Sequence, residues 1–528
     1  MKLNGNIITI IVMLKEVSDS MRLRCTLITI ALVSLIFLGG CYQPGPGSKP
    51  WQASFSDKDA PNIIVSTTDG NSSEMHIAPI ITASTPTPNP PITLPTPRSE
   101  TLTYVVQQGD FLRKISQKYQ VSINQIVEAN DIADQNLIEV GQVLLIPPSS
   151  FTDVAPGFKI LPDSELINSP SNADFDVAKF VAAQGGYLSV YSEEVDDVRM
   201  SGAEILEQVA LLFSVNPRLL LSVLEFQSQW VTEKEPPDET LEFPMRYYDA
   251  WNSGLFDQLA WAANLLNEGY YLWKLEAISM WELSDFSMIG VDPTINAGTA
   301  GVLNLMRHLT TEEDWRWAVS ETGIFATYYR FFGYPFDHGI EPLIPDDLVQ
   351  VELQLPFQAG AVWSFTGGPH GGWGTGSAWA ALDFAPPGEA LGCFPSDAWA
   401  VAVAPGEVVY SGHGAVIQDL DGDGVWQTGW SILYMHMDTQ DRVSVGTYVE
   451  AGDRVGHPSC EGGFSTGTHL HIARRYNGEW IAADGNLPFV MDGWVSSGYG
   501  VEYDGYLTKG DTVLEAWNGR TATNAIQR

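Results

Sequence analysis

The chain has few basic residues: 27 Lys and Arg stand against 64 Asp and Glu among its 528 residues, and the formal net charge is −37. This balance excludes a nucleic-acid-binding surface, which needs a basic face to meet phosphates. Only 17% of the residues are charged, whereas 45% are hydrophobic, with 17 Trp, 19 Tyr and 22 Phe among the aromatics. We therefore expect a mostly globular chain, long enough for three or four domains, rather than one that its charge keeps disordered.

The apolar run near the N-terminus is too short to span a bilayer comfortably. Residues 21–24 are basic, residues 26–38 are apolar, and Leu38-Gly39-Gly40-Cys41 follows. Such an order is typical of an export signal. Its end resembles a bacterial lipobox, which implies that Cys41 is lipidated and anchors the chain to the membrane. We expect a signal peptide over 1–41 and an extracytoplasmic, wall-facing lipoprotein; the alternative is a plain cleavable signal.

Cysteine is scarce, with four residues in the whole chain. Cys25 lies in the signal and Cys41 at its end, so Cys393 and Cys460 remain for the exported part. Export places both in an oxidising compartment, where one disulfide between them is the simple interpretation. Two free thiols are the alternative, because a sequence does not show whether two side chains meet.

Residues 42–100 lack any hydrophobic period and are rich in Pro, Ser, Thr and Asn, most densely over 83–97. We predict a disordered, semi-rigid tether there. At about 3.1 Å per residue in the polyproline II conformation, it could reach on the order of 100–180 Å. A membrane-anchored protein could then act on a distant target such as a cell wall.

Residues 101–149 show the order strand, helix, helix, strand. The four segments are 103–106, 111–119, 122–130 and 142–147. Gly109-Asp110, Asn130 and the run Val140–Pro147 stand in the order found in LysM modules, and the stretch resembles that family. The resemblance implies a small βααβ domain that binds N-acetylglucosamine-containing glycans, chiefly peptidoglycan and chitin. A LysM fold that has lost glycan binding is the alternative.

Residues 174–345 are predicted to form a mainly α-helical middle domain. Helical spacing of apolar residues is found over 203–213, 217–230, 255–273 and 297–308. Residues 215–228 and 296–301 resemble lysozyme-type or lytic transglycosylase folds. In that family a catalytic glutamate directly precedes a serine at the end of the first helix.

Gln227 occupies that place here, and an amide cannot act as the general acid of a glycosidase. Glu225 lies two residues earlier and faces another direction on a helix. We interpret the middle domain as a non-catalytic relative that holds glycan or acts as a spacer. A plain helical bundle and an active muramidase are the alternatives.

Residues 350–515 change in character, because short runs containing Val and Tyr stand between Gly and Pro. The clearest runs are 400–410, 415–418, 430–437 and 447–456. Several short strands separated by turn residues predict an all-β antiparallel domain.

Six of the nine histidines lie between His370 and His471. His370 is followed after twelve residues by Asp383, and His436 and the pair His469 and His471 come later. Residues i and i+2 of a strand point to the same face, so His469 and His471 are expected to face one site. Histidines and a carboxylate that converge on one pocket can hold zinc and activate a water.

The motifs Gly-Pro-His370, Asp383, Tyr-Met-His436 and His469-Leu-His471 resemble the M23 zinc metallopeptidases, in the same order. The long gap before Asp383 is similar to the β-lytic, staphylolysin-like branch. The resemblance implies that His370, Asp383 and His471 bind one zinc ion.

The resemblance further implies that His436 and His469 are catalytic: they position or deprotonate the attacking water and stabilise the charged intermediate. It implies a zinc metalloendopeptidase that hydrolyses peptide cross-links of peptidoglycan. A non-catalytic peptidoglycan-binding scaffold, or a regulator of other wall hydrolases, is the alternative. His413 and His457 match no zinc motif and are expected in loops.

Asp419, Asp421 and Asp423, followed by Gly424, resemble the start of a calcium loop. The glutamate that closes an EF-hand is absent, because Trp430 stands there. A Ca²⁺ site and an acidic turn both remain open, and we favour the turn.

Overall fold

The computed structural model describes residues 98–528, except 108–109, 133–136, 149–152 and 389–391. The expected signal peptide with Cys41, and nearly all of the expected tether, lie outside the described residues. Within the described part of the chain, no helix is both long and apolar enough to cross a membrane.

The predicted βααβ unit is present. Its elements are β1 (Leu102–Val105), α2 (Leu112–Tyr119), α3 (Ile123–Ala129) and β2 (Val143–Ile146). The two strands pair antiparallel, with Leu102 opposite Ile146. Helix α3 begins with a capping box in which Ser122 and Gln125 satisfy each other's backbone N–H groups. Buried apolar side chains, including Ile115, Ile126 and Leu144, form the small core.

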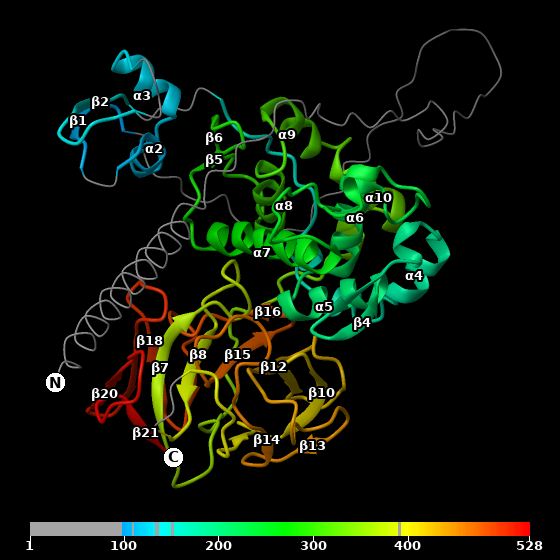
Figure 1. Ribbon diagram of the computed structural model, residues 1–528, viewed down its shortest axis with the longest axis vertical. Helices are drawn as coiled ribbons and strands as arrows, with labels where there is room; N and C mark the ends of the chain where they lie inside the picture. The colour runs from blue at the N-terminus through cyan, green and yellow to red at the C-terminus, as the bar shows by residue number, and fades with distance from the viewer. Residues whose placement is uncertain (1–97, 108–109, 133–136, 149–152, 389–391) are drawn as a thin grey trace, which may run out of the picture. The chain divides into compact units, whose positions relative to one another are not determined.

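The middle domain is mainly helical, as predicted (Figure 1). Its helices are α4 (Val177–Gln184), α5 (Gly202–Phe213), α6 (Pro217–Ser228), α7 (Leu255–Lys274), α8 (Ala297–Arg307), α9 (Glu312–Ala318) and α10 (Ile324–Phe332). Short 3-10 turns are η1 (Asp163–Glu165), η2 (Pro170–Asn172), η3 (Tyr187–Ser189), η4 (Asp238–Thr240) and η5 (Pro335–His338). Two hairpins were not anticipated: β3 (Ser192–Val195) with β4 (Val198–Ser201), and β5 (Met280–Glu282) with β6 (Met288–Gly290).

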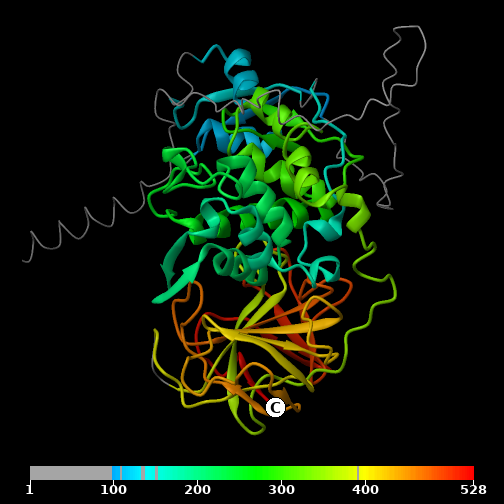
Figure 2. The ribbon, with the colours of Figure 1, turned by 90° about the vertical axis from the view of Figure 1, so that its right-hand side faces the viewer.

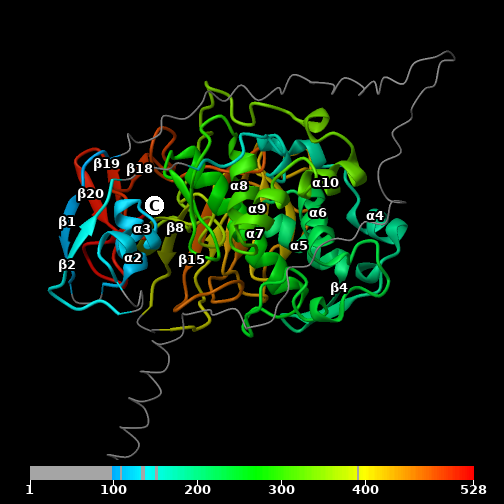
Figure 3. The same ribbon diagram turned by 90° about the horizontal axis from the view of Figure 1, so that it is seen from above.

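Small residues set the packing of α7 against α8, which run side by side in Figure 3. A Cβ atom added to Gly269 would lie 2.6 Å from the carbonyl oxygen of Ala300 and 2.8 Å from Cα of Gly301. One added to Gly301 would lie 2.6 Å from the carbonyl oxygen of Leu266. The glycines of the 296–301 motif therefore have a packing role in this fold.

The C-terminal domain is built on a large antiparallel sheet, as predicted for this part of the chain. Its strands are β7 (Val362–His370), β8 (Ala381–Ala385), β10 (Gly406–Gly412), β11 (Ala415–Asp419), β12 (Trp430–Met435), β13 (Tyr448–Val449), β15 (Leu470–Tyr476), β16 (Glu479–Trp480) and β21 (Ala525–Gln527). They follow the order β13-β10-β11-β12-β15-β8-β7-β21, and β16 pairs with β15. Smaller sheets comprise β9 (Ala400–Val401) with β14 (Arg454–Gly456), and β17 (Val490–Met491), β18 (Trp494–Ser497), β19 (Tyr506–Lys509) and β20 (Thr512–Glu515).

The two faces of the large sheet belong to different cores. Alternate residues of a strand share a face, so Asp383 lies on the side of Ala381, and His471 on the side of Ala473. Both alanines, together with Leu433, are buried in the same hydrophobic cluster as the middle domain. The opposite face packs into a separate core. The helices therefore cover the sheet face that carries Asp383 and His471 (Figure 2).

Polar contacts anchor this cover at the C-terminal end of α5. Arg475 donates to the carbonyl oxygens of Leu211 (3.0 Å) and Leu212 (3.1 Å), and Trp480 Nε1 donates to that of Phe213 (3.3 Å). The last carbonyls of a helix have no partner within the helix, and a cation is favourable at that end. The middle and C-terminal domains thus share one packed interface.

Candidate metal centre and active site

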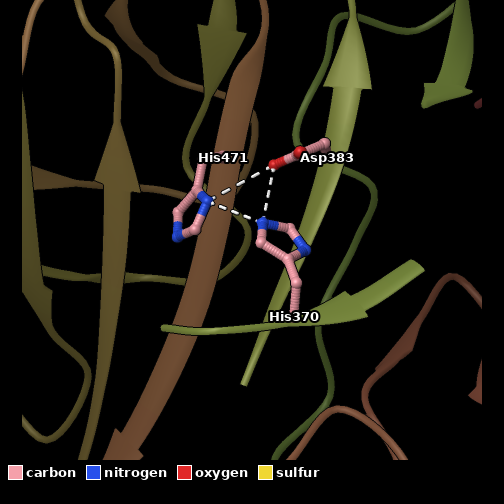
Figure 4. A group of neighbouring side chains, drawn as sticks. All are labelled: His370, Asp383 and His471. Atoms are coloured by element: carbon pink, nitrogen blue, oxygen red, sulfur yellow. Dashed lines mark hydrogen bonds and ion pairs between the residues drawn. The ribbon is translucent and has the colours of Figure 1, made fainter. Parts of the chain in front are cut away.

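Three adjacent strands bring His370, Asp383 and His471 together. His370 ends β7, Asp383 lies within β8, and His471 is the second residue of β15. Asp383 is directly opposite His471 in the register of β8 and β15. His370 Nε2 lies 3.0 Å from His471 Nδ1, and Asp383 Oδ1 lies 3.2 and 3.3 Å from these two atoms (Figure 4). All three side chains are buried.

Backbone carbonyls determine which nitrogen of each ring carries the hydrogen. His370 Nδ1 lies 2.8 Å from the carbonyl oxygen of Gly368, and His471 Nε2 lies 2.9 Å from that of Gly372. A carbonyl only accepts, so these nitrogens are the donors. The remaining nitrogens, His370 Nε2 and His471 Nδ1, face Asp383 and carry lone pairs when the rings are neutral.

This arrangement fits a bound cation. Two lone pairs 3.0 Å apart repel each other, and Asp383 Oδ1 is buried without a hydrogen bond. Tetrahedral zinc with bonds of about 2.0–2.1 Å places its ligand atoms roughly 3.3 Å apart, and the spacings here are 3.0–3.3 Å. Two imidazoles and one carboxylate form a donor set that zinc accepts.

In the metal-free chain, a proton on His370 supplies the positive charge that a bound cation would supply. Burial opposes the ionised form of Asp383, but the charge of His370 and then that of His469 outweigh it and hold the pKa of Asp383 well below its usual range. Burial likewise opposes protonation of His370, yet the carboxylate of Asp383 raises the pKa of His370. A carboxylate kept ionised in a buried site needs a positive partner.

His436 and His469 lie beside the three-residue cluster. Their ring centroids are 4.4 Å apart, and His469 Nε2 is 3.6 Å from Asp383 Oδ1. His436 Nδ1 lies 3.0 Å from the carbonyl oxygen of Glu461, and His469 Nδ1 lies 2.7 Å from that of Gly467. Both Nδ1 atoms are therefore donors, and both Nε2 atoms are free to accept a proton.

His436 is held neutral and in an unusual backbone conformation. Burial, and then the neighbouring charges of His469 and His471, lower the pKa of His436 to about 3. Its φ is +64°, a left-handed value that L-residues rarely adopt and that is found at functional sites. The carbonyl of His436 accepts hydrogen bonds from the backbone N–H (2.6 Å) and the hydroxyl (3.1 Å) of Ser459.

One cross-linked loop supplies the carbonyl groups that accept from His436 and His469. Glu461 directly follows Cys460, and both it and Gly467 lie between β14 and β15. Cys460 is joined to Cys393 by a disulfide, with Cα atoms 5.6 Å apart. Thr468 Oγ1 accepts a hydrogen bond of 2.8 Å from the N–H of Phe394, next to that bond. The disulfide thus lies between the loop that orients His436 and His469 and the segment around residue 393.

Asp419, Asp421 and Asp423 lie close together, and their carboxylates accept hydrogen bonds from backbone N–H groups of the same turn. Asp419, Asp421 and Asp423 offer oxygens within 4.8 Å of one another. Asp419 accepts from the N–H groups of Asp421 (3.2 Å) and Gly424 (2.9 Å), and Asp423 accepts from that of Val425 (2.8 Å). These bonds are those of an acidic turn, and calcium binding stays a prediction.

Glu225 is occupied by structural contacts. Its carboxylate accepts from the N–H groups of Val231 (3.2 Å) and Thr232 (3.1 Å) and pairs with Arg330 at 2.8 Å. Gln227 is buried, with Nε2 3.6 Å from the sulfur of Met306. Neither side chain offers the free acid that glycoside hydrolysis requires.

The two other histidines between His370 and His471 lie in loops. His457 Nδ1 lies 2.8 Å from the carbonyl oxygen of Ala398, and its ring lies 3.8 Å from that of Trp399. His413 lies 3.5 Å from the carboxylate of Asp196 in the β3–β4 turn.

Sequence reasoning missed the four carbonyl acceptors and Tyr503. The ring of Tyr503 stacks on that of His370, with centroids 4.2 Å apart. No motif marks a backbone carbonyl, and Tyr503 lies far along the chain in a turn, so local spacing held no signal for either.

Comparison with known families matches three successive segments of the chain. The family "LasA, N-terminal domain" matches residues 159–344, the "LysM domain" family matches 104–147, and "Peptidase family M23" matches 393–483. The last match contains His436, His469 and His471 and begins after His370 and Asp383.

Individual relatives match parts of the chain. Protease LasA of Pseudomonas aeruginosa is 27% identical over 304 residues, which are 54% of this chain and 68% of that protein. The beta-lytic metalloendopeptidase of Lysobacter enzymogenes is 30% identical over 169 residues, 30% of this chain and 88% of its own length. The solved structure of the M23 metalloprotease pseudoalterin aligns with 34% of this chain and 100% of its own, at 21% identity and a TM-score of 0.28.

Proposed function

This chain belongs to peptidase family M23, and from that premise we propose that it is a zinc metalloendopeptidase that hydrolyses peptide cross-links of peptidoglycan. The observation that carries the proposal is Asp383 Oδ1, which is buried without a hydrogen bond between two imidazole lone pairs. His370 Nε2, His471 Nδ1 and the Asp383 carboxylate would hold one zinc ion with a fourth position left open. When bound, zinc polarises the scissile carbonyl and makes a water nucleophilic near neutral pH.

His436 and His469 are the proton-handling pair in this proposal. The Nδ1 of each ring donates to a backbone carbonyl, which leaves Nε2 as the proton-accepting atom. A neutral imidazole can take the proton of the attacking water and return it to the leaving amine. In its protonated form it also stabilises the negative charge that develops on the carbonyl oxygen.

The other domains support a wall substrate. The LysM domain belongs to a family of glycan-binding modules and would hold peptidoglycan, leaving peptide cleavage to the metal centre. The proposed division is LysM over 101–149, the helical domain over 174–345 and the peptidase domain over 350–515. The proposed location is extracytoplasmic, with Cys41 lipidated and residues 42–100 as the tether.

A scaffold or regulator is less well supported. Such a protein has no need of a charged, unsatisfied carboxylate in its interior, because burying one is costly. All five motif side chains are present and converge on one point.

The test is digestion of purified peptidoglycan by the full chain loaded with zinc, with the products analysed by mass spectrometry. Wild type is compared with His471→Ala, and Asp441→Asn is the control for loss of a carboxylate in an exposed turn. We expect new peptide termini from wild type and Asp441→Asn, and none from His471→Ala.

The mass of each new terminus also identifies the bond that is cleaved. If wild type binds one zinc per chain but releases no peptide, a regulatory role replaces the enzymatic one. If wild type binds no zinc, the metal centre itself is refuted.

A further inference from the structure

A turn from a different sheet reaches the metal centre. Residues 498–505 connect β18 to β19, and Tyr503 in this turn lies against His370. The two rings are stacked, with centroids 4.2 Å apart and an interplanar angle of 21°. Tyr503 lies outside the segment 393–483 that matches peptidase family M23. Tyr503 is not one of the five motif residues, of which His370 and Asp383 also lie outside that segment.

Backbone contacts press this turn onto the end of β7. The N–H of Gly368 donates to the carbonyl of Tyr503 (2.7 Å), and the N–H of Tyr503 donates to that of Pro369 (3.2 Å). A Cβ atom on Gly368 would lie 2.6 Å from the backbone of Asp504, and one on Gly505 would lie 2.6 Å from the Pro369 ring. No side chain fits between the two segments, so the turn cannot move without disturbing the residues that precede His370.

The backbone of Tyr503 is itself in an uncommon conformation. Its φ is +67°, where the Cβ of an L-residue is crowded. A bulky residue keeps this conformation only where its surroundings over-determine it. Here the paired hydrogen bonds to Gly368 and Pro369 do so, and the result is that the ring covers the imidazole.

Two other contacts of His370 leave its ring free to tilt, and Tyr503 restricts this motion. The carbonyl of Gly368 holds Nδ1, and the ring of His471 meets the imidazole edge-on with centroids 4.8 Å apart. Neither contact prevents the plane of the imidazole from tilting. A tilt would swing Nε2 away from Asp383 Oδ1, and an aromatic ring stacked on one face opposes it.

We propose that Tyr503 is a positioning residue for His370: its ring fixes the plane of the imidazole so that Nε2 stays directed at Asp383 and His471. This inference rests on the proposed metal centre. Groups that orient a ligand typically change metal affinity about 10–100-fold when they are removed.

The test compares zinc affinity, measured by competition with a chromogenic chelator, among full-length variants. Tyr503→Asn removes the ring while Asn tolerates positive φ, so the turn is preserved. Tyr503→Phe keeps the ring and removes the hydroxyl. Tyr499→Asn is the matched control, because Tyr499 lies in the same turn, is equally exposed at 52%, and contacts the ring of Tyr506.

We expect zinc to bind about 10–100-fold more weakly to Tyr503→Asn and with unchanged affinity to Tyr503→Phe and Tyr499→Asn. At saturating zinc, Tyr503→Asn should recover most of the wild-type kcat/KM. Wild-type affinity in Tyr503→Asn, or an equal loss in Tyr503→Phe, would overturn the positioning role. Absence of zinc binding in wild type would instead refute the proposed function.

Discussion

His370 Nε2 and His471 Nδ1 face each other at 3.0 Å, while the second nitrogen of each ring donates to a backbone carbonyl behind it. The first ring ends β7 and the second lies in β15, with β8 between them in the sheet. The sheet therefore forces two lone pairs together, and Asp383 from the central strand completes the group.

Zinc should stabilise the folded chain, because a ligand that binds only the folded state adds about 2.7 kcal/mol at 100 times its Kd. Asp383→Asn keeps the shape of the side chain but removes the charge, so it should abolish the zinc-dependent rise in Tm and the activity. Without metal, the variant should be no less stable than wild type. Calorimetry with zinc and with a chelator tests this, with Asp441→Asn as control. An undiminished Tm shift in Asp383→Asn would contradict the prediction.

Acid should destabilise the metal-free protein through His436. Its pKa is about 3 when folded against about 6.5 when unfolded, so between these values the unfolded chain binds the extra proton. The contribution of His436 is fully present above pH 6.5 and falls by at most roughly 1.4 kcal/mol per pH unit below it.

Urea unfolding at pH 7.5 and 5.5 measures this dependence. His436→Asn keeps a donor for the carbonyl of Glu461 but cannot titrate, so its unfolding free energy should fall less between the two pH values. An identical fall in wild type and His436→Asn would show that His436 does not titrate in this way.

The disulfide should matter more for catalysis than for metal binding. The double variant Cys393→Ser, Cys460→Ser frees the loop whose carbonyls orient His436 and His469, whereas the metal ligands lie on strands. We expect at least a 10-fold loss of kcat/KM with zinc affinity nearly unchanged. In the chain-entropy model, closing a loop of 67 residues is worth roughly 4.4 kcal/mol, so Tm should fall as well.

Zinc titration beside peptidoglycan digestion, both below the lowered Tm, separates these effects. Loss of zinc affinity in parallel with activity would mean that the disulfide supports the whole centre rather than the histidine pair.

The peptidase segment should not be stable alone. Residues 350–528 without the middle domain would expose the apolar sheet face that carries Ile417, Leu433 and Ala473. Arg475 would lose the carbonyl groups to which it donates. Large exposed apolar patches lead to association. We expect this fragment to aggregate or to bind the dye ANS.

Light scattering and ANS fluorescence of the fragment beside the full chain test this expectation. A monomeric fragment with the zinc affinity of the full chain would show that the interface is dispensable.

Local patterns in the sequence identified much of the fold. Helical spacing located α5, α6, α7 and α8 to within about two residues, because amphipathic periodicity reports directly on burial. The hairpins β3–β4 and β5–β6 were not predicted, because strands of three or four residues show too little alternation of apolar and polar residues.

The donor set could be identified from the sequence: it is the residue types and order of His370, Asp383, His436, His469 and His471, and the alternation that lets His469 and His471 face one site. The free nitrogen depends on the folded chain: distant carbonyls fix it for His436 (Glu461) and His471 (Gly372), and for His370 and His469 the carbonyl two residues earlier fixes it. Only the tertiary structure decided that Tyr503 stacks on His370 and that helices cover the sheet face beside the site. The chemistry of a side chain is given by its residue type, whereas its orientation in the site depends on the contacts that the folded chain makes around it.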